Sequence, residues 1–399
     1  MTTIAAAWTA CDDLAAMLSA IDPDGDQCRY VGGAVRDALL GIEATDIDIA
    51  TRLLPEEVMA RLEAAGIKAV PTGLAHGTVT AVLPRGPVEI TTLRRDVTTD
   101  GRHAEVAFTD DWREDAARRD FTINALFACP RTLEVTDYFG GLDDLAARRV
   151  RFIGDAGERI MEDHLRILRY FRFHARFGGV ADAGALTACT AHADRLKALS
   201  RERIARELLL LLGSAAPLET VKLMAKAGIW PVILPEMARD GLIVLQDLLR
   251  REATVAAAPE GLLRLAALLP VDPLVAESVA ARLRLSKAQR QALARYATAW
   301  PDGETGRQVA AITQSANLVP SWLLLRADEA QASQEWQSLQ GWTAPDFPVS
   351  GRHILALGVS AGPAVARVLG ETRKRWIAED FPGEARAHEI ASALAAQAG

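Results

Sequence analysis

The sequence predicts an α+β multidomain protein, in which a small mixed or antiparallel sheet with helices is followed by a long all-helical region. Short strand-like runs such as TVTAVL, VEITTL and LEVTDYF lie between Gly and Pro breaks before about residue 150. From Arg159 onward, amphipathic segments rich in Ala, Leu and Arg follow one another and are typical of helices. The 399 residues, half of them hydrophobic, suffice for two or three domains with large cores.

Charge and cysteine content limit the classes of function. The formal net charge of −7 means that a nucleic-acid partner would need local basic patches, because the average surface repels phosphate. The four cysteines show no CxxC spacing, which argues against a disulfide framework or zinc cluster and favours a reducing compartment. No apolar run approaches the roughly 20 residues of a membrane span, and the N-terminus lacks a basic leader region. We therefore expect a cytoplasmic protein with no membrane partner.

A possible phosphate-binding turn lies near the N-terminus. CRYV is typical of a strand, Gly32 and Gly33 of a tight turn, and AVRDALL of a short helix that ends at Gly41. Free backbone N–H groups at a helix N-terminus suit a phosphate. Arg36, one turn into the helix, could hold phosphate oxygens with its guanidinium. The alternative is a structural turn without a ligand, because Gly-Gly turns are common.

Three carboxylates in strand-like segments suggest a metal site. In DIDIA the side chains alternate, so Asp46 and Asp48 share one exposed strand face while the isoleucines face the core. Such carboxylates repel each other unless a cation lies between them, and their oxygens suit Mg²⁺. Glu89 in VEITTLR offers a third carboxylate on an exposed face. A solvated acidic strand edge and an ordinary exposed glutamate are the alternatives.

A charged helix face is predicted for GERIMEDHLRILRYFRFHARF, interpreted as one continuous helix. Asp163 and Arg166, three residues apart, would then reach one planar ligand. The carboxylate accepts and the guanidinium donates, which matches the amine and ring nitrogen of cytosine or adenine. Guanine and uracil present the reverse pattern, and each unpaired buried polar group costs about 1–3 kcal/mol. A solvated face stabilised by ion pairs along the helix is the alternative.

Together these segments carry a family resemblance. The chain contains, in order, GGAVRD, DIDIAT, HGTVTAVL, VEITTLR, DGRHAEVAF, RRDFTINAL, DYFGGLDDL and EDHLRILRYFRFHARF. These motifs resemble those of the class II tRNA nucleotidyltransferase and bacterial poly(A) polymerase family, within the polymerase-β-like nucleotidyltransferase superfamily. The resemblance implies a catalytic nucleotidyltransferase head at 1–153, a helical neck at 154–235 with a nucleotide-selecting EDxxR motif, and an elongated helical body and tail at 236–399 that bind tRNA.

The resemblance also implies roles for individual residues. Asp46, Asp48 and Glu89 would be catalytic, with Asp46 and Asp48 as ligands of Mg²⁺. The nucleotide, CTP or ATP, would be bound by Gly32, Gly33, Arg36, Asp37, Arg119, Asp120, Asn124, Glu162, Asp163, Arg166, Arg169 and Arg172. The segment from Arg95 to Glu105 resembles the family's flexible loop. Basic patches that are candidate RNA contacts, with solvated helix faces as the alternative, comprise Arg282, Arg284, Lys287, Arg373, Lys374 and Arg375.

The predicted function is template-independent addition of C, C and A to the tRNA 3′ end from CTP and ATP, with release of pyrophosphate by two-metal transfer. A poly(A) polymerase of the same family and a CC-only or A-only adding enzyme are the alternatives. The end of the sequence, AHEIASALAAQAG, lacks the basic extension usual in bacterial poly(A) polymerases and favours the tRNA enzyme. From other classes, an inactive RNA-binding module is disfavoured by the intact Asp46 and Asp48, and a dinucleotide-dependent oxidoreductase by the incomplete GxGxxG motif.

Overall fold

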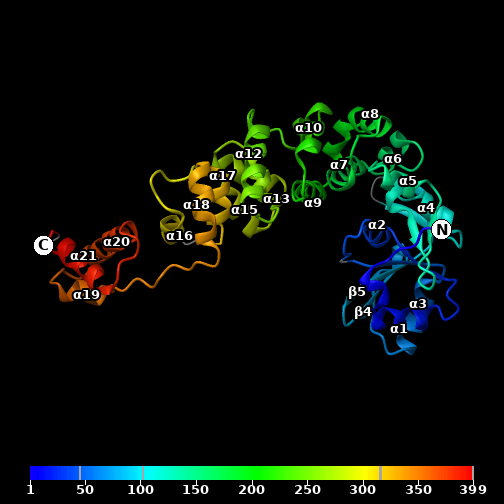
Figure 1. Cartoon of the computed structure of the whole chain (residues 1–399), viewed down its shortest axis with the longest axis horizontal. Coiled ribbons are helices and arrows are strands. Elements are labelled where there is room, and N and C mark those ends of the chain that lie inside the picture. The colour runs from blue at the N-terminus through cyan, green and yellow to red at the C-terminus, as the bar shows by residue number, and fades with distance from the viewer. Residues whose placement is uncertain (45, 101–102, 314–316, 398–399) are drawn as a thin grey trace. The chain divides into compact units, whose positions relative to one another are not determined.

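The strands of the described residues all lie in the first part of the chain and helices make up the rest, which confirms the predicted α+β class. The computed structural model describes residues 1–44, 46–100, 103–313 and 317–397; of residues 96–100 and 103–106 only the backbone is described. The described chain divides into two compact units, Met1–Pro235 and Glu236–Gly399 (Figure 1). The division of the first unit into a head and a neck stays a prediction.

A seven-stranded mixed sheet is the centre of the first unit, with the strand order β3-β4-β5-β2-β1-β8-β9. Strands β2 and β5 pair in parallel, and the other neighbours pair antiparallel. The parallel pair places Asp48 directly opposite Glu89. The strands are β1 (Cys28–Val31), β2 (Asp48–Thr51), β3 (Ala69–Gly73), β4 (Thr78–Leu83), β5 (Gly86–Thr92), β8 (Leu126–Ala128) and β9 (Val135–Asp137).

A separate antiparallel hairpin consists of β6 (Arg94–Asp100) and β7 (His103–Phe108). It contains most of the segment for which the sequence predicts a flexible loop. Residues 101 and 102, at its turn, lie outside the described residues, so the flexible loop stays a prediction.

Helices flank the sheet and continue beyond it in the first unit. Helix α3 packs on strands β4 and β5, and α1 packs on α3 (Figure 1). Helix α7 packs on α9 and α10. The helices are α1 (Asp12–Ile21), α2 (Gly33–Leu39), α3 (Pro55–Ala64), α4 (Trp112–Ala117), α5 (Gly141–Ala146), α6 (Ala156–Glu162), α7 (Arg166–Phe177), α8 (Ala183–Ala191), α9 (Arg201–Leu212), α10 (Leu218–Lys226) and α11 (Trp230–Ile233), with 3₁₀ turns at Ala7–Ala10, Leu74–His76, Thr122–Asn124 and Ala193–Ala198.

Aromatic packing joins Phe121 and Phe152, which lie outside the named strands and helices, to α7. The Phe121 ring lies 4.8 Å from that of Phe152 and 5.4 Å from that of Phe173, centroid to centroid. Tyr170 stacks on Phe152 at 6.0 Å. Phe121 and Tyr170 are fully buried, so this cluster holds the inner face of α7 while its arginines lie on the other side.

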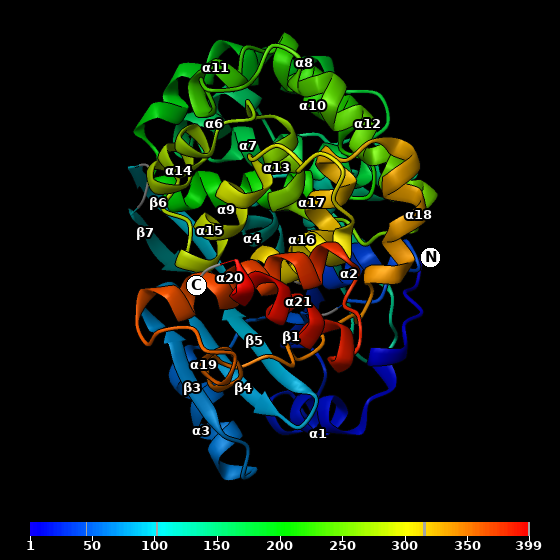
Figure 2. The same cartoon turned by 90° about the vertical axis from the view of Figure 1, so that its left-hand side faces the viewer.

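The second unit is helical throughout its described residues. Helices α19, α20 and α21 pack together (Figure 2) around a core that includes Trp376 and Ile377. Within the described residues no helix has both the length and the apolar character that crossing a bilayer requires. The helices are α12 (Gly241–Thr254), α13 (Gly261–Ala267), α14 (Pro273–Arg282), α15 (Lys287–Tyr296), α16 (Gly306–Thr313), α17 (Val319–Arg326), α18 (Glu329–Leu339), α19 (Gly351–Ala356), α20 (Pro363–Ala378) and α21 (Glu384–Ala396).

Candidate active site

The glycine turn between β1 and α2 has the backbone conformation that its sequence predicts. Gly32 has φ 70° and ψ −121°, a combination that side chains with a Cβ rarely adopt. A Cβ at this position would also lie 3.4 Å from Nη1 of Arg119. The turn therefore brings Arg119, from a distant segment, to the start of α2, where Gly33 is the first residue.

Arg36 is turned inward from this helix and is almost fully buried. Its Nε donates to Asp37 at 2.9 Å and its Nη1 donates to Asn124 at 2.5 Å. The guanidinium also lies 4.2 Å from the ring centroid of Phe177 in α7, and Asp37 forms a second ion pair with Arg176 of α7 at 3.1 Å. In this arrangement Arg36 and Asp37 tie α2 to α7, and their predicted contact with the nucleotide stays a prediction.

The carboxylates predicted to hold a metal lie at the parallel strand pair. Strand β2 begins only at Asp48, so the predicted strand position of Asp46 is wrong; Asp46 is exposed in the segment just before it. The predicted alternation is confirmed further along, because Ile47 and Ile49 are buried and Glu89 is exposed. Burial, with the nearby charges of Glu89 and then Asp46, raises the pKa of Asp48 to about 6, although Arg119 opposes this.

At Asp48, burial and the charges of two neighbouring carboxylates outweigh the positive charge of Arg119. A buried carboxylate whose neighbours are also carboxylates is stabilised by a cation, and oxygen ligands suit Mg²⁺. Within the described part of the chain, no three His, Cys, Asp or Glu side chains are gathered closely enough to enclose a metal ion. The chemistry of the donors thus fits Mg²⁺, while the assignment of Asp46 and Asp48 as its ligands stays a prediction.

The RRD segment after α4 is held by ion pairs, and among these only the two to Asp115 have a helical spacing in the sequence. Arg119 donates from Nη2 to the buried Asp115 at 2.9 Å, and Arg118 pairs with the other Asp115 oxygen at 2.7 Å. Asp120 accepts from Asn124 at 3.0 Å and from Nε of Arg169 at 2.6 Å. Burial alone would raise the pKa of Asp120, but Arg169 and Asn124 hold it below its usual value. Asp120 is therefore a fixed, charged acceptor.

The predicted continuous helix through the EDxxR motif is wrong. Helix α6 ends at Glu162 and α7 begins at Arg166. Asp163 lies between them in an extended conformation, with φ −149° and ψ 107°, and its carboxylate accepts from the backbone N–H of Leu165 at 3.1 Å. This local hydrogen bond competes with helix formation, so Asp163 and Arg166 are not neighbours on one helix.

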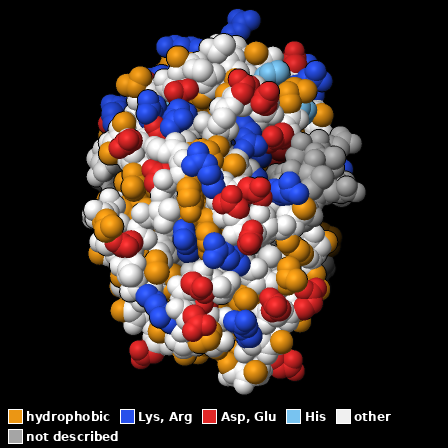
Figure 3. Space-filling model, turned by 90° about the vertical axis from the view of Figure 1, so that its right-hand side faces the viewer, with side chains coloured by type: hydrophobic (Ala, Val, Ile, Leu, Met, Phe, Trp, Pro, Cys, Tyr) orange, Lys and Arg blue, Asp and Glu red, His pale blue; other side chains and the backbone are white. Residues whose placement is uncertain are grey.

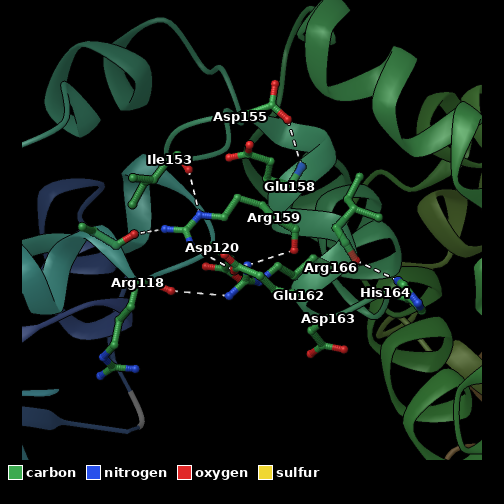
Figure 4. A network of polar contacts seen from close by, with 12 residues as sticks. Arg118, Asp120, Ile153, Asp155, Glu158, Arg159, Glu162, Asp163, His164 and Arg166 are labelled. Atoms are coloured by element: carbon green, nitrogen blue, oxygen red, sulfur yellow. Dashed lines mark hydrogen bonds and ion pairs between the residues drawn. The ribbon is translucent and has the colours of Figure 1, made fainter. Parts of the chain in front are cut away.

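Glu162 and Arg166 form a compact cluster with Arg159 (Figure 4). Glu162 accepts from Arg159 at 2.8 Å and from Arg166. Arg166 also donates to the backbone carbonyl of Arg159 at 2.9 Å and, more weakly, to that of Arg118 at 3.4 Å. The Asp163 carboxylate lies apart from this cluster in Figure 4. The structure thus brings Arg166 to the RRD segment but does not pair it with Asp163.

Helix α9 supplies the partners of the remaining charged residues. Asp163 accepts from Nη2 of Arg203 at 2.7 Å. Arg172 donates to Glu207 at 2.5 Å, and Arg169 lies 3.9 Å from the same carboxylate. The predicted charged face of α7 is therefore paired with surrounding segments and is not a solvated wall.

Sequence reasoning gave no place at the nucleotide site to four residues that lie near it. Each of these residues lies three to 40 positions along the sequence from the side chain that it contacts. Only a separation of one helix turn indicates a pair from the sequence. The i, i+3 spacing of Arg159 and Glu162 offered such a signal. The four residues are Asp115, Arg159, Arg203 and Glu207.

The six candidate RNA contacts all lie in the second unit, and acidic partners are found for three of them. Arg282 pairs with Glu236 at 2.5 Å, Lys374 with Glu371 at 2.8 Å, and Arg375 with Glu379 at 3.4 Å. Arg284, Lys287 and Arg373 are exposed. Charges of both signs are interspersed over the face shown in Figure 3 as well. The role of the six candidate residues in RNA binding stays a prediction.

Comparison with known proteins places this site in a family. The family described as "Poly A polymerase head domain" matches residues 28–151, and "Probable RNA and SrmB-binding site of polymerase A" matches residues 182–240. The human "CCA tRNA nucleotidyltransferase 1, mitochondrial" is 35% identical over 375 residues, which cover 88% of this chain and 83% of the human protein. The chain belongs to the class II CCA-adding tRNA nucleotidyltransferase and poly(A) polymerase family. It is a nucleotidyltransferase, as the sequence predicts.

Other members of this family extend the match over nearly the whole chain. The "CCA-adding enzyme" of Levilactobacillus brevis is 32% identical over 92% of this chain and 94% of its own length. The crystal structure of the Bacillus stearothermophilus CCA-adding enzyme with CTP has a TM-score of 0.71 at 25% identity and covers 92% of this chain and 93% of that one. The Thermotoga maritima CCA-adding enzyme bound to tRNA shares the fold, with a TM-score of 0.66, 20% identity and full coverage of both chains.

Proposed function

We propose that this nucleotidyltransferase adds C, C and A to the 3′ end of tRNA, using CTP and ATP and releasing pyrophosphate. The observation that carries the proposal is the register of β2 against β5, which sets Asp48 opposite Glu89. Gly32 and Arg119 adjoin each other, and Arg119 acts electrostatically on Asp48. Carboxylates next to a glycine turn and an arginine suit the transfer of a nucleotide from a triphosphate.

Mg²⁺ is the proposed cofactor, with Asp46 and Asp48 as its ligands and Glu89 beside them. When bound, the metal would neutralise negative charge on the triphosphate and favour ionisation of the attacking hydroxyl. The raised pKa of Asp48 supports this assignment, because a carboxylate destabilised by burial and by two like charges gains from a nearby cation.

The chain's own side chains would position the nucleotide. Arg119, whose guanidinium is partly exposed beside Gly32, is placed to bind phosphate oxygens. Asp120, charged and fixed by Asn124 and Arg169, is an acceptor suited to a ribose hydroxyl. Asp163 and Arg166 would contact the base, as acceptor and donor. Direct in-line attack by the RNA 3′-hydroxyl on the α-phosphate requires no covalent enzyme intermediate.

We further propose that the helical residues 154–235 contribute base selection and that residues 236–399 bind tRNA. The similarity of residues 182–240 to an RNA-binding family supports the extension of RNA contacts beyond the head. For the compartment we propose the cytoplasm, consistent with four cysteines that are free in the structure. The relatives named as mitochondrial show that the family also works in an organelle.

The decisive experiment extends a radiolabelled tRNA that lacks its 3′ CCA, with CTP alone, ATP alone or both. We expect two C additions with CTP and a single terminal A once ATP is present. Asp46→Ala should lower the rate at least ~1,000-fold, because metal-assisted charge stabilisation is lost. Asp163→Ala should retain transfer and lose the preference for CTP and ATP over UTP and GTP.

Asp24→Ala, which removes an exposed carboxylate in the loop between α1 and β1, is the matched control and should be fully active. Long A tails on tRNA and on unrelated RNA with ATP alone would instead identify a poly(A) polymerase, the activity named for the family that matches residues 28–151. Addition that stops after CC with both nucleotides present would identify a CC-adding enzyme.

A further inference from the structure

Both oxygens of the Asp163 carboxylate are held, from two different elements. Oδ1 accepts from the backbone N–H of Leu165 at 3.1 Å, within the break between α6 and α7. Oδ2 accepts from Nη2 of Arg203, in α9, at 2.7 Å. The side chains of Asp163 and Arg203 are 27% and 30% exposed, so the pair is open to a ligand on one side. Each carboxylate oxygen has two lone pairs, and one on each oxygen remains available.

Arg166 is held independently of Asp163. Its guanidinium is bound by Glu162 and by the backbone carbonyl of Arg159 (Figure 4). Within the described EDxxR segment, no hydrogen bond or ion pair joins the Asp163 carboxylate to this guanidinium, since the helix is broken between them. The acceptor, Asp163, is therefore held by Arg203, and the donor, Arg166, is held by Glu162. Their placement relative to a base depends on these two separate contacts.

We propose that Arg203 is a specificity-determining positioning residue, which orients the Asp163 carboxylate to accept from the exocyclic amine of cytosine or adenine. This inference rests on the proposed function, because it assumes that Asp163 contacts the base. A charge-assisted hydrogen bond at 2.7 Å fixes the position of the carboxylate. A deprotonated, oriented carboxylate accepts from an amine and repels the carbonyl that uracil or guanine presents at the same place.

Removal of Arg203 should redirect Asp163. Burial would lower the pKa of the nearby Arg169 guanidinium, but Asp120, then Glu207 and, more weakly, Asp163 raise it. Arg169 is thus a second guanidinium within electrostatic range of Asp163, and it attracts the carboxylate once Arg203 is gone. The contact with the amine of C and A is then weakened, whereas U and G are not bound more weakly, because Asp163 repels their carbonyl and forms no hydrogen bond with it.

The experiment uses the full-length chain and compares Arg203→Gln, Arg203→Lys and the control Arg206→Gln. Arg206 lies on the same helix, is exposed, and has no ion pair or hydrogen bond among the described residues. Single-nucleotide addition is measured with CTP and UTP on tRNA lacking CCA, and with ATP and GTP on tRNA ending in CC. Unfolding midpoints of all variants verify that each is folded.

For Arg203→Gln we expect kcat/KM for CTP and ATP to fall ~10- to 100-fold, the range for loss of a charge-assisted hydrogen bond, while the values for UTP and GTP stay within about threefold. Arg203→Lys should restore part of the selectivity, because it keeps the charge but not the forked geometry. Arg206→Gln should keep the wild-type preference for CTP and ATP over UTP and GTP.

An equal fall for all four nucleotides, or selectivity unchanged in Arg203→Gln, would overturn the inference and leave Arg203 as a structural or RNA-binding residue. Failure of the proposed function has a different signature. In that case the wild-type chain itself would not prefer CTP and ATP on these tRNA substrates, whatever residue occupies position 203.

Discussion

At the scale of single residues, Gly32 shows how a sequence pattern fixes local structure. Its φ of 70° and ψ of −121° exclude a Cβ on steric grounds, and Arg119 lies 3.4 Å from where that Cβ would be. We expect Gly32→Ala to lower the free energy of unfolding by about 2–3 kcal/mol, through backbone strain at a position that cannot relax. Urea unfolding followed by circular dichroism measures this difference.

Gly41→Ala is the matched control for Gly32→Ala. Gly41 also has a positive φ, 68°, but a Cβ there meets no atom within 4 Å. The control should lose only about 1 kcal/mol, the cost of the left-handed conformation itself. Equal losses for both variants would show that a side chain tolerates the backbone conformation of Gly32 as well as that of Gly41.

The prediction of residue environments succeeded where one local pattern decides the outcome. Alternation in DIDIA predicted that Ile47 and Ile49 are buried, and the Gly-Gly pair predicted the turn before α2. The prediction of a continuous helix failed at Asp163. Helical periodicity describes only the spacing of side chains, and it does not show that the Asp163 carboxylate accepts a hydrogen bond from the backbone N–H of Leu165. It could not foresee Arg203 as the partner of Asp163, since 40 residues separate them.

At the scale of elements, α7 is the helix that connects the site to its surroundings. Its polar face pairs with α2 through Arg176 and Asp37, and with α9 through Arg172 and Glu207. Its buried face contains His174, whose Nδ1 lies 2.8 Å from the Thr220 hydroxyl of α10. The sequence predicted which face of the helix is apolar, but the identity of each packing partner depends on the tertiary fold.

We expect His174 to make the stability of the fold pH-dependent. Burial disfavours the imidazolium and lowers the pKa of His174. Above the ordinary histidine pKa of about 6.5, the imidazole of His174 is neutral in both the folded and the unfolded chain. As the pH falls below that value the unfolded chain binds a proton there and the folded chain does not, so stability is lost until the folded pKa is reached.

Urea unfolding at pH 7.0 and pH 5.5 tests this linkage. Between these values the wild type should lose about 1 kcal/mol more than His174→Gln, which cannot titrate. His76→Gln, at an exposed histidine, should lose as much as the wild type. A His174→Gln variant with the full wild-type loss would assign the pH dependence to other groups.

At the scale of the whole molecule, the residues proposed to act on the nucleotide all belong to the unit Met1–Pro235. The unit Glu236–Gly399 has its own buried electrostatic centre, where Glu252 of α12 accepts from Arg264 of α13 at 2.7 Å with both side chains almost fully buried. We therefore expect that the second unit can be destabilised without an effect on nucleotide binding by the first unit.

Glu252→Ala tests this separation, because it removes the carboxylate that compensates the buried charge of Arg264. The loss should be about 3–5 kcal/mol, and it should fall on the second unit alone. Hydrogen exchange followed by mass spectrometry should show faster exchange in α12 to α17 and unchanged exchange in the seven-stranded sheet. CTP affinity of the variant should equal that of the wild type, while extension of tRNA should fall if residues 236–399 hold the RNA.

The double variant Glu252→Leu with Arg264→Met distinguishes charge from packing in this prediction. Both ionic partners are then replaced by apolar side chains, so no buried charge is left uncompensated and stability should return to within about 1 kcal/mol of the wild type. Extension of tRNA should recover with it, because the fold of the second unit is restored. Weaker CTP binding in Glu252→Ala would instead mean that the two units share one cooperative transition, and that the nucleotide site depends on the helical region beyond Pro235.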